Sequence, residues 1–181
     1  EHEAAEPALS VMLESEFDAV VLKSLIAIRK RQLDSLGPQV VEATTHASSA
    51  IRRHAAETLG ALDDPASADV LCQLLENDPS EEVCIGAARA LGKLGDSLAV
   101  PFLENALKRE ATIRCAAVVA LGEIRSTNAQ PALLAMLQDT APGVRYQAAM
   151  SLARMDAKEA QPAIAALPVS YTHLTLPTTI E

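Results

Sequence analysis

Three cysteines are the residues in this sequence that could most readily do chemistry. Cys72, Cys84 and Cys115 are odd in number and form no C-x-x-C pair. A structural thiolate metal site usually needs four converging ligands, and these thiols are widely spaced in the chain. We therefore predict small packing residues, kept reduced in a cytoplasmic protein, with no metal site and no cofactor. A redox-active or ligand-attaching thiol is the alternative.

Catalytic constellations are the next possibility. A nucleophile needs a base within hydrogen-bond reach, and no spacing in the sequence sets up such a pair around the histidines. The paired carboxylates Asp63-Asp64 and Glu81-Glu82 are typical of helix starts, where acids favour the helix dipole. No phosphate-binding G-x-x-x-x-G-K-[ST] loop occurs. We predict no catalytic residue and a protein that is not an enzyme.

Arginines recur at equivalent places. Arg52, Arg114 and Arg145 each follow an Ile or Val, and Asp78 and Asp139 stand in loops before such positions. One interpretation is a ladder between units, in which each Arg meets the carboxylate of the preceding loop. An anion-binding ridge is the alternative.

These positions belong to a repeat of about 31 residues. Leu59, Leu91, Leu121 and Leu152 stand 32, 30 and 31 residues apart, and the first three precede a Gly. Small or apolar residues eight, four and three positions before each Leu, and three after it, share one face of a helix. Gly costs a helix about 1 kcal/mol relative to Ala, so its recurrence predicts either a close backbone contact or the last helical turn.

A second helix is predicted after each of these. Pro101, Pro131 and Pro162 stand ten residues beyond their Leu, and proline is harmless in a first helical turn. Apolar residues follow at helical spacing. In the second unit they are Phe102, Leu103, Ala106 and Leu107. The predicted fold class is all-α, an α-solenoid of antiparallel helix pairs.

Three runs carry a family resemblance. They read I-R-x-A-A-x-x-A-L-G at 113–122, V-R-x-x-A-A-x-x-L at 144–152 and P-x-L-L-x-x-L at 131–137. They resemble the short HEAT-like repeats first described in bilin-lyase subunits of phycobilisomes, over about residues 51–167. The resemblance implies a solenoid whose second helices line the concave face. It implies little about function, because such repeats serve many unrelated proteins.

The chain divides by this template into an acidic segment at 1–17, a degenerate capping helix pair at 18–50, and four repeats. The repeats are 51–82, 83–112, 113–143 and 144–167, the last truncated. From Pro168 the helical period is lost, and 168–181 resembles a translated sequencing adapter. We therefore expect a non-native tail on a fragment of a longer protein; a native β-rich tail is the alternative.

Charge argues against nucleic acid as the partner. The net charge is −9, and residues 1–18 carry acids but no Lys or Arg. The rest is nearly balanced, without the basic surplus of a nucleic-acid binder, although a basic patch could hide within that total. No apolar run is long enough to span a membrane.

Another protein is the predicted partner. Positions 13, 14 and 17 after each Leu should face outward from the second helix, Cys72 among them. Leu134 with Ala135, Ala165 and Ala166 should then form a shallow apolar patch fit for a partner; the alternative is that further repeat units cover this patch. The predicted partner-binding residues are Gln73, Glu76, Glu104, Asn105, Lys108, Leu134, Ala135 and Gln138. The function so indicated is a non-catalytic scaffold or adaptor. The alternative is a subunit similar to bilin lyases, or another enzyme-accessory subunit, which would handle an open-chain tetrapyrrole.

Overall fold

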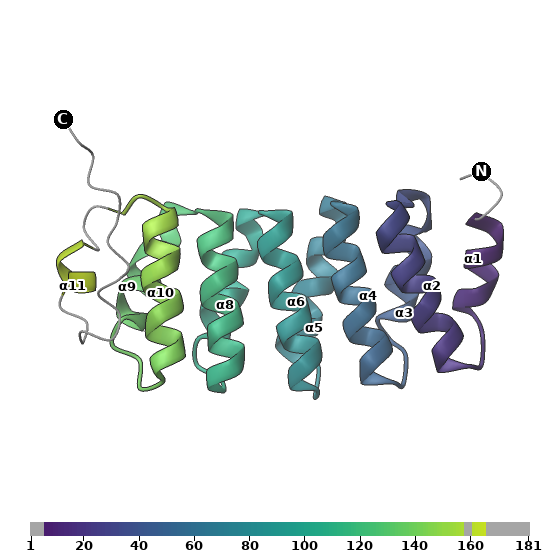
Figure 1. Ribbon diagram of the computed structural model, residues 1–181, viewed down its shortest axis with the longest axis horizontal. Helices are drawn as coiled ribbons and strands as arrows, with labels where there is room; N and C mark the ends of the chain where they lie inside the picture. Colours follow the sequence, from purple (N-terminus) through teal and green to yellow (C-terminus); the bar gives the residue numbers. More distant parts are fainter. Residues whose placement is uncertain (1–5, 158–160, 166–181) are drawn as a thin grey trace.

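The computed structural model describes residues 6–157 and 161–165, and every regular element in these ranges is helical. Long helices alternate with short ones along the chain (Figure 1). The long helices are α2 (Asp18–Arg31), α4 (Ser49–Leu62), α6 (Glu81–Leu94), α8 (Ala111–Ile124) and α10 (Pro142–Arg154). The short helices are α1 (Glu6–Leu13), α3 (Gly37–Ala43), α5 (Ala68–Asn77), α7 (Val100–Ala106), α9 (Gln130–Met136) and α11 (Gln161–Ala165). The predicted all-α solenoid is confirmed.

Local sequence explains where these helices begin and end. Each of the helices α2, α4, α6 and α8 ends at a residue in the left-handed region, with φ between 54° and 68°, and one of these residues is Gly95. A single 3₁₀ turn, η1 (Asp34–Leu36), η2 (Pro65–Ser67), η3 (Ser97–Ala99) or η4 (Thr127–Ala129), then leads into the next short helix. Proline stands in the first turn of α3, α7 and α9, as predicted at Pro101 and Pro131.

The leucines that define the repeat form the core. Leu59, Leu91, Leu121 and Leu152 are all fully buried. The small residues before them, such as Ala55 and Ala87, are buried as well. Burying a Leu side chain contributes about 1.5–3 kcal/mol, so these positions supply much of the driving force for stacking.

The glycines mark the closest approach of neighbouring long helices. A Cβ added at Gly60 would lie 2.6 Å from the Cα of Ala90, one added at Gly92 would lie 2.8 Å from the Cα of Ala120, and one at Gly122 would lie 2.9 Å from the Cα of Ser151. Real Cβ atoms do not come this close to backbone. The close contact predicted from the recurring Gly is therefore confirmed.

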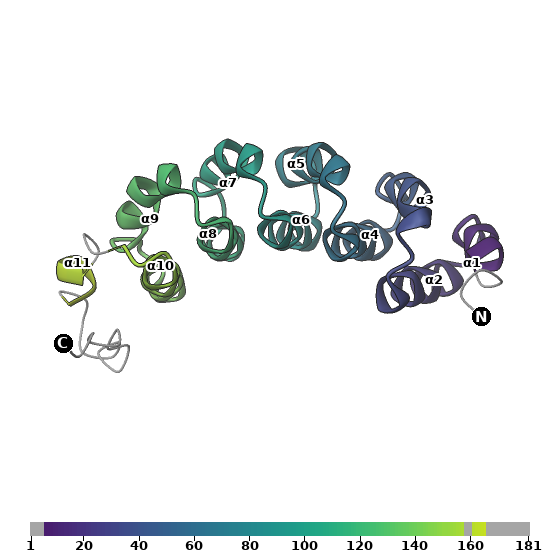
Figure 2. The same cartoon turned by 90° about the horizontal axis from the view of Figure 1, so that it is seen from above.

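The helices form two layers in an arch. Figure 2 shows the long helices along the inner side of the arch and the short helices along the outer side. Neighbouring long helices share extensive contacts, whereas neighbouring short helices touch little. The closely packed layer takes the shorter, inner arc. The expectation that the second, short helices line the concave face is therefore wrong: glycine and alanine let the long helices approach, and the stack bends toward them.

Packing also shows which helices form a pair. Each of the short helices α3, α5, α7 and α9 packs mainly on the long helix that follows it in the chain. The predicted boundaries at 82, 112 and 143 instead group each short helix with the long helix before it. That division of the repeat stays a prediction.

The ends complete the description. Helix α1 packs on α2 and α3 and extends the stack at its N-terminal side. The predicted non-native tail, 168–181, lies outside the described residues, as does Ala166. Among the described helices none is both long and apolar enough to cross a membrane.

Candidate functional site

The eight predicted partner-binding residues belong to the short-helix layer and therefore to the convex side. Those that are exposed are Gln73, Glu76, Asn105, Lys108, Ala135 and Gln138. Glu104 and Leu134 are half-buried. Leu134 packs against the core, so the predicted apolar patch is reduced to exposed alanines there.

Cys72 corrects one part of that prediction. It is buried, at 5% exposure, instead of facing outward. Helix α5, which carries Cys72, contacts η3 at the start of the next helix pair, so the neighbouring pair helps to cover this position. A template based on one helix pair cannot include cover supplied by the next pair.

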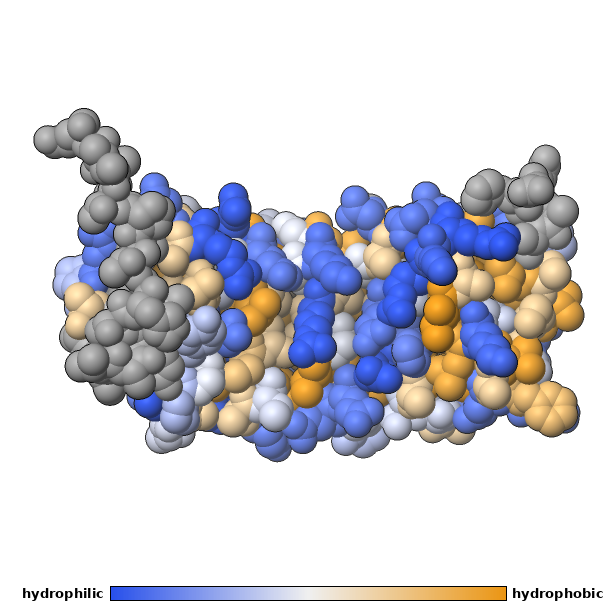
Figure 3. Space-filling model, in the orientation of Figure 1, coloured by the Kyte–Doolittle hydropathy of each residue, from blue (hydrophilic) through white to orange (hydrophobic). Residues whose placement is uncertain are grey.

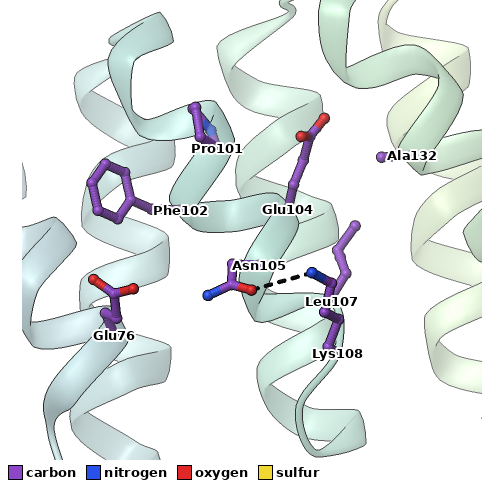
Figure 4. A pocket seen from close by; sticks show the side chains of 8 residues that line it. All are labelled: Glu76, Pro101, Phe102, Glu104, Asn105, Leu107, Lys108 and Ala132. Atoms are coloured by element: carbon purple, nitrogen blue, oxygen red, sulfur yellow. Dashed lines mark hydrogen bonds between the residues drawn. The ribbon is translucent and has the colours of Figure 1, made fainter.

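A groove of about 550 Å³ lies on the convex side between α5, α7 and α9 (Figure 4). Its lining includes four of the predicted residues, Glu76, Glu104, Asn105 and Lys108. Lys108 donates a hydrogen bond to Oδ1 of Asn105 across 3.4 Å. Gln73, Leu134, Ala135 and Gln138 are not part of its lining. The structure thus brings half of the predicted set together; whether any of them binds a partner stays a prediction. We call this the convex groove.

Phe102 gives the convex groove an apolar side. Its ring stands beside Pro101 and faces the Glu76 side of the groove (Figure 4). The sequence placed Phe102 on the buried stripe of its helix, yet 37% of it is exposed. The chain has two Phe residues, and Phe17 is exposed as well. Exposed aromatic side chains are preferred anchors in protein interfaces. The core of this solenoid is built from aliphatic and small side chains, so a Phe in the sequence could have been recognised as a candidate surface residue.

A second groove of the same volume, about 550 Å³, lies on the opposite side, between the long helices α6, α8 and α10. Its lining includes Ile85, Arg89, Cys115, Val119 and Gln147. We call it the concave groove. Sequence reasoning missed it because the direction in which the stack bends is not visible in the spacing.

The three cysteines are free thiols. Burial raises the pKa of the Cys72 thiol to about 11. Burial also raises the pKa of Cys84 and of Cys115. A raised pKa keeps a thiol protonated and unreactive near neutral pH. Within the described residues, no three His, Cys, Asp or Glu side chains come together in a way that could hold a metal ion.

The arginine ladder exists, with its direction partly reversed. Arg52 binds Asp78 through Nε at 2.7 Å and a terminal nitrogen at 3.0 Å. Arg114 binds Asp139 in the same bidentate way, at 2.8 Å for both bonds. Each carboxylate therefore comes from the loop that leads into the next long helix, and not from the loop that precedes the helix of the Arg. The preceding loop instead supplies carbonyls, as Asp139 and Thr140 do for Arg145.

These pairs are well shielded from solvent. The side chain of Asp78 is 4% exposed and that of Asp139 is 8% exposed. Burial alone would raise the pKa of Asp78, but Arg52 and the N–H of Ser80 hold it below its usual value. Arg114 likewise lowers the pKa of Asp139 against the effect of burial. The guanidinium groups of Arg52, Arg114 and Arg145 already have hydrogen-bond partners within the protein. This disfavours the alternative of an anion-binding ridge.

We call each of these Arg–Asp pairs a rung of the ladder, and the contact at the equivalent place on α6 is built differently. Cys84 occupies the place of the repeating Arg, and its loop partner is Arg109. A terminal nitrogen of Arg109 donates to the Leu75 carbonyl at 2.7 Å and lies 3.4 Å from the sulfur of Cys84. Here the guanidinium comes from the loop and its partner Cys84 from the long helix, whereas Arg52 and Arg114 lie on long helices and their Asp partners in loops. The sequence shows the missing Arg at Cys84 but not its replacement from the following loop.

His54 lies in a charged cluster on α4. Its Nδ1 is 3.5 Å from Glu57, and Glu57 also pairs with Arg29 at 2.7 Å and Arg53 at 3.4 Å. Burial lowers the pKa of His54, so the imidazole is neutral near pH 7. The ion pair between Arg29 and Glu57 connects α2 to α4, so we assign this cluster a role in helix packing.

Comparison with known proteins agrees with this architecture. A family model described as HEAT repeats matches residues 5–83, 37–114 and 109–168. No curated protein is significantly similar to the chain.

Solved structures are similar in fold. A chain of the complex of CpcE and CpcF of phycocyanin lyase from Nostoc sp. PCC7120 superposes with a TM-score of 0.75 at 20% identity, covering 91% of this chain and 71% of that one. An engineered protein superposes with a TM-score of 0.61 at 22% identity, covering 87% and 83%. A second engineered protein also gives 0.61, at 19% identity, covering 96% and 91%. At such identities the likeness concerns the fold alone.

Proposed function

The chain belongs to the family of HEAT-repeat proteins, and on that premise we propose that it is a non-catalytic scaffold that binds another protein through the convex groove. The observation that carries this proposal is the exposed Phe102 within a groove that also has charged side chains along its lining. An apolar centre with a polar rim is the usual anatomy of a protein interface. Glu76, Glu104 and Lys108 would supply the rim.

The other predicted residues would extend this surface. Gln73 continues the α5 side, and Ala135 and Gln138 continue the α9 side of the convex layer. Leu134 would contribute its exposed part. Substituting Leu134 with Glu is expected to weaken the partner's binding; unchanged affinity would remove α9 from the proposed surface.

The experiment places a photo-crosslinking phenylalanine analogue at position 102 of the full chain in extract from the source cells. We expect one covalent adduct with a protein, formed at 102 and lost when Glu76 and Glu104 are both changed to Lys. The matched control carries the analogue at Asn128, which is exposed in η4 outside the groove. Equal adducts at both positions, or none at 102, would contradict the proposal.

An enzyme-accessory subunit that handles an open-chain tetrapyrrole is the second candidate. The fold similarity to a chain of the phycocyanin lyase complex is the observation that favours it. Mixing the protein with an open-chain tetrapyrrole should then shift the pigment's visible absorbance. An unshifted spectrum would leave the scaffold as the one candidate of the two. A cytoplasmic location is part of the scaffold proposal and rests on the free thiols.

A further inference from the structure

Charge is divided between the two layers. The long helices α2, α4, α6, α8 and α10 together contain eleven Lys and Arg but five Asp and Glu. The short helices α3, α5, α7 and α9 contain no Lys or Arg, and their acids are Glu42, Asp69, Glu76 and Glu104. The nearly balanced total therefore hides a positive concave layer and a negative convex one.

Part of that positive charge is already neutralised. Arg52 and Arg114 are held by Asp78 and Asp139, and Arg29 and Arg53 share Glu57. Other bases of the long helices are exposed and make no ion pair with the described residues. They are Lys23, Lys30, Arg31, Arg89, Lys93 and Arg154. These side chains are the ones available to a ligand.

The concave groove sits among them. Arg89 lines it, and Lys93 stands one turn further along the same helix. The rest of the lining is largely apolar, with Ile85 and Val119 half-buried on adjacent helices. In Figure 3, which faces this layer, hydrophilic stripes alternate with apolar strips across the surface. A ligand there meets positive charge and apolar surface together.

We propose that the concave groove binds an acidic polypeptide segment, with carboxylates at Arg89 and Lys93 and an apolar side chain between Ile85 and Val119. Packed helices lie about 8–10 Å apart, so α6 to α10 span about 20 Å. An extended segment rises about 3.3 Å per residue and crosses this distance with about six residues. Opposite charge gives such a segment its orientation and its rate of association.

A nucleic acid fits this surface less well. Binding to single strands relies on stacking of bases on aromatic side chains, and no aromatic residue lines the concave groove. Glu81 accepts a hydrogen bond from the hydroxyl of Thr112 in the lining, and Glu123 on α8 is exposed, so the face is not uniformly positive. Carboxylates on a flexible peptide can avoid these acids, whereas evenly spaced phosphates cannot.

The test is fluorescence anisotropy with the full chain and a labelled peptide in which pairs of Glu alternate with single Leu. We expect binding that weakens with added salt and falls about tenfold when Arg89 and Lys93 are both changed to Glu. The matched control is Lys108→Glu, the same charge change on the convex side, which should leave the affinity unchanged. A peptide with Ser in place of Leu should bind several-fold more weakly.

Each opposite outcome overturns the proposal. These are no binding to the unaltered chain, an equal loss with Lys108→Glu, no dependence on Leu, or tighter binding of a single-stranded oligonucleotide than of the peptide. Helical circular dichroism of the variants confirms that they fold. The convex groove enters this experiment only through the control Lys108→Glu. A failure of peptide binding would therefore leave the proposed scaffold function standing, and the converse also holds.

Discussion

The long-helix and short-helix layers differ in how closely their members approach. In the concave layer, a glycine of one helix meets the backbone of the next. In the convex layer, neighbouring helices touch little and a groove opens between α5, α7 and α9. The difference indicates that the two layers have different roles. The concave layer of long helices holds the solenoid together, and the convex layer of short helices presents side chains and contributes little to the stacking. We call this the division of labour between the layers.

The Arg–Asp pairs connect each long helix to the loop that leads into the next long helix. Arg52 on α4 reaches Asp78 in the loop that leads into α6, and Arg114 does the same one unit further on. Between them, Arg109 reaches back to the Leu75 carbonyl beside Cys84. Both arrangements place a guanidinium on backbone carbonyls near the start of a long helix, those of the preceding loop for Arg52 and Arg114 and that of Leu75, in the last turn of α5, for Arg109.

The largest expected effect tests the close packing of the concave layer. Gly60→Ala would put a methyl group 2.6 Å from the Cα of Ala90, and overpacking of this kind costs about 1–3 kcal/mol. Chemical denaturation should show that loss. The control is Gly37→Ala in the convex layer, where an added Cβ meets nothing within 4 Å; no loss is expected there. Equal losses in the free energy of unfolding for Gly60→Ala and Gly37→Ala would contradict the claim that the concave layer is packed more closely than the convex layer.

The next largest effect concerns the rungs. Arg114→Ala removes both bonds to Asp139 and the bond to the Arg109 carbonyl, which should lower stability by about 0.5–2 kcal/mol. Partner binding should not change. Arg154→Ala serves as the control, because Arg154 is an exposed base of the same layer with no ion pair among the described residues. A melting temperature unchanged by Arg114→Ala would argue against the ladder.

Acid should weaken the same rungs by a smaller amount. The pKa values of Asp78 and Asp139 are lowered in the fold, and an unfolded Asp titrates near about 3.9. Their contribution is therefore complete above about pH 5 and is lost as the pH falls through the folded-state values. Unfolding measured against pH should show this loss, and it should shrink in the double variant Asp78→Asn, Asp139→Asn. An identical acid profile in that variant would contradict the assignment.

A small effect on stability is expected in the convex layer. Phe102→Ser removes a side chain that is 37% exposed, and loss of its partial burial should cost about 1 kcal/mol. Binding of the partner identified by the crosslink at 102 should nevertheless weaken, measured as the affinity of that partner for the Phe102→Ser chain. A large drop in stability would show that the convex layer also carries the stack, and the division of labour would then be wrong.

The sequence was sufficient to predict the helical elements and the core. Recurrence of Leu59, Leu91 and Leu121 identified the buried positions, and the glycines after them identified the close contacts. Both follow from periodicity within one helix. The prolines Pro101 and Pro131 marked the starts of short helices for the same local reason.

The features that the sequence did not predict depend on how neighbouring helix pairs pack on one another. The arch bends toward whichever layer packs more closely, and that balance is not contained in the spacing of one unit. Cys72 lies on α5, which contacts η3 of the next helix pair, and Asp78 binds Arg52 from the loop that leads into the next long helix. Phe102 occupies an apolar position of the template but looks into a groove because its layer is spread. Each misplacement concerns the convex layer or a contact between units.

Native-state hydrogen exchange, resolved by residue, tests the division between the two layers most directly. Amides in the middle of α4, α6 and α8 should exchange more slowly than those of α5, α7 and α9, since a closely packed helix opens less often than one with few neighbours. Equal protection in the two layers, or slower exchange in the short helices, would contradict the claim that the concave layer holds the solenoid together.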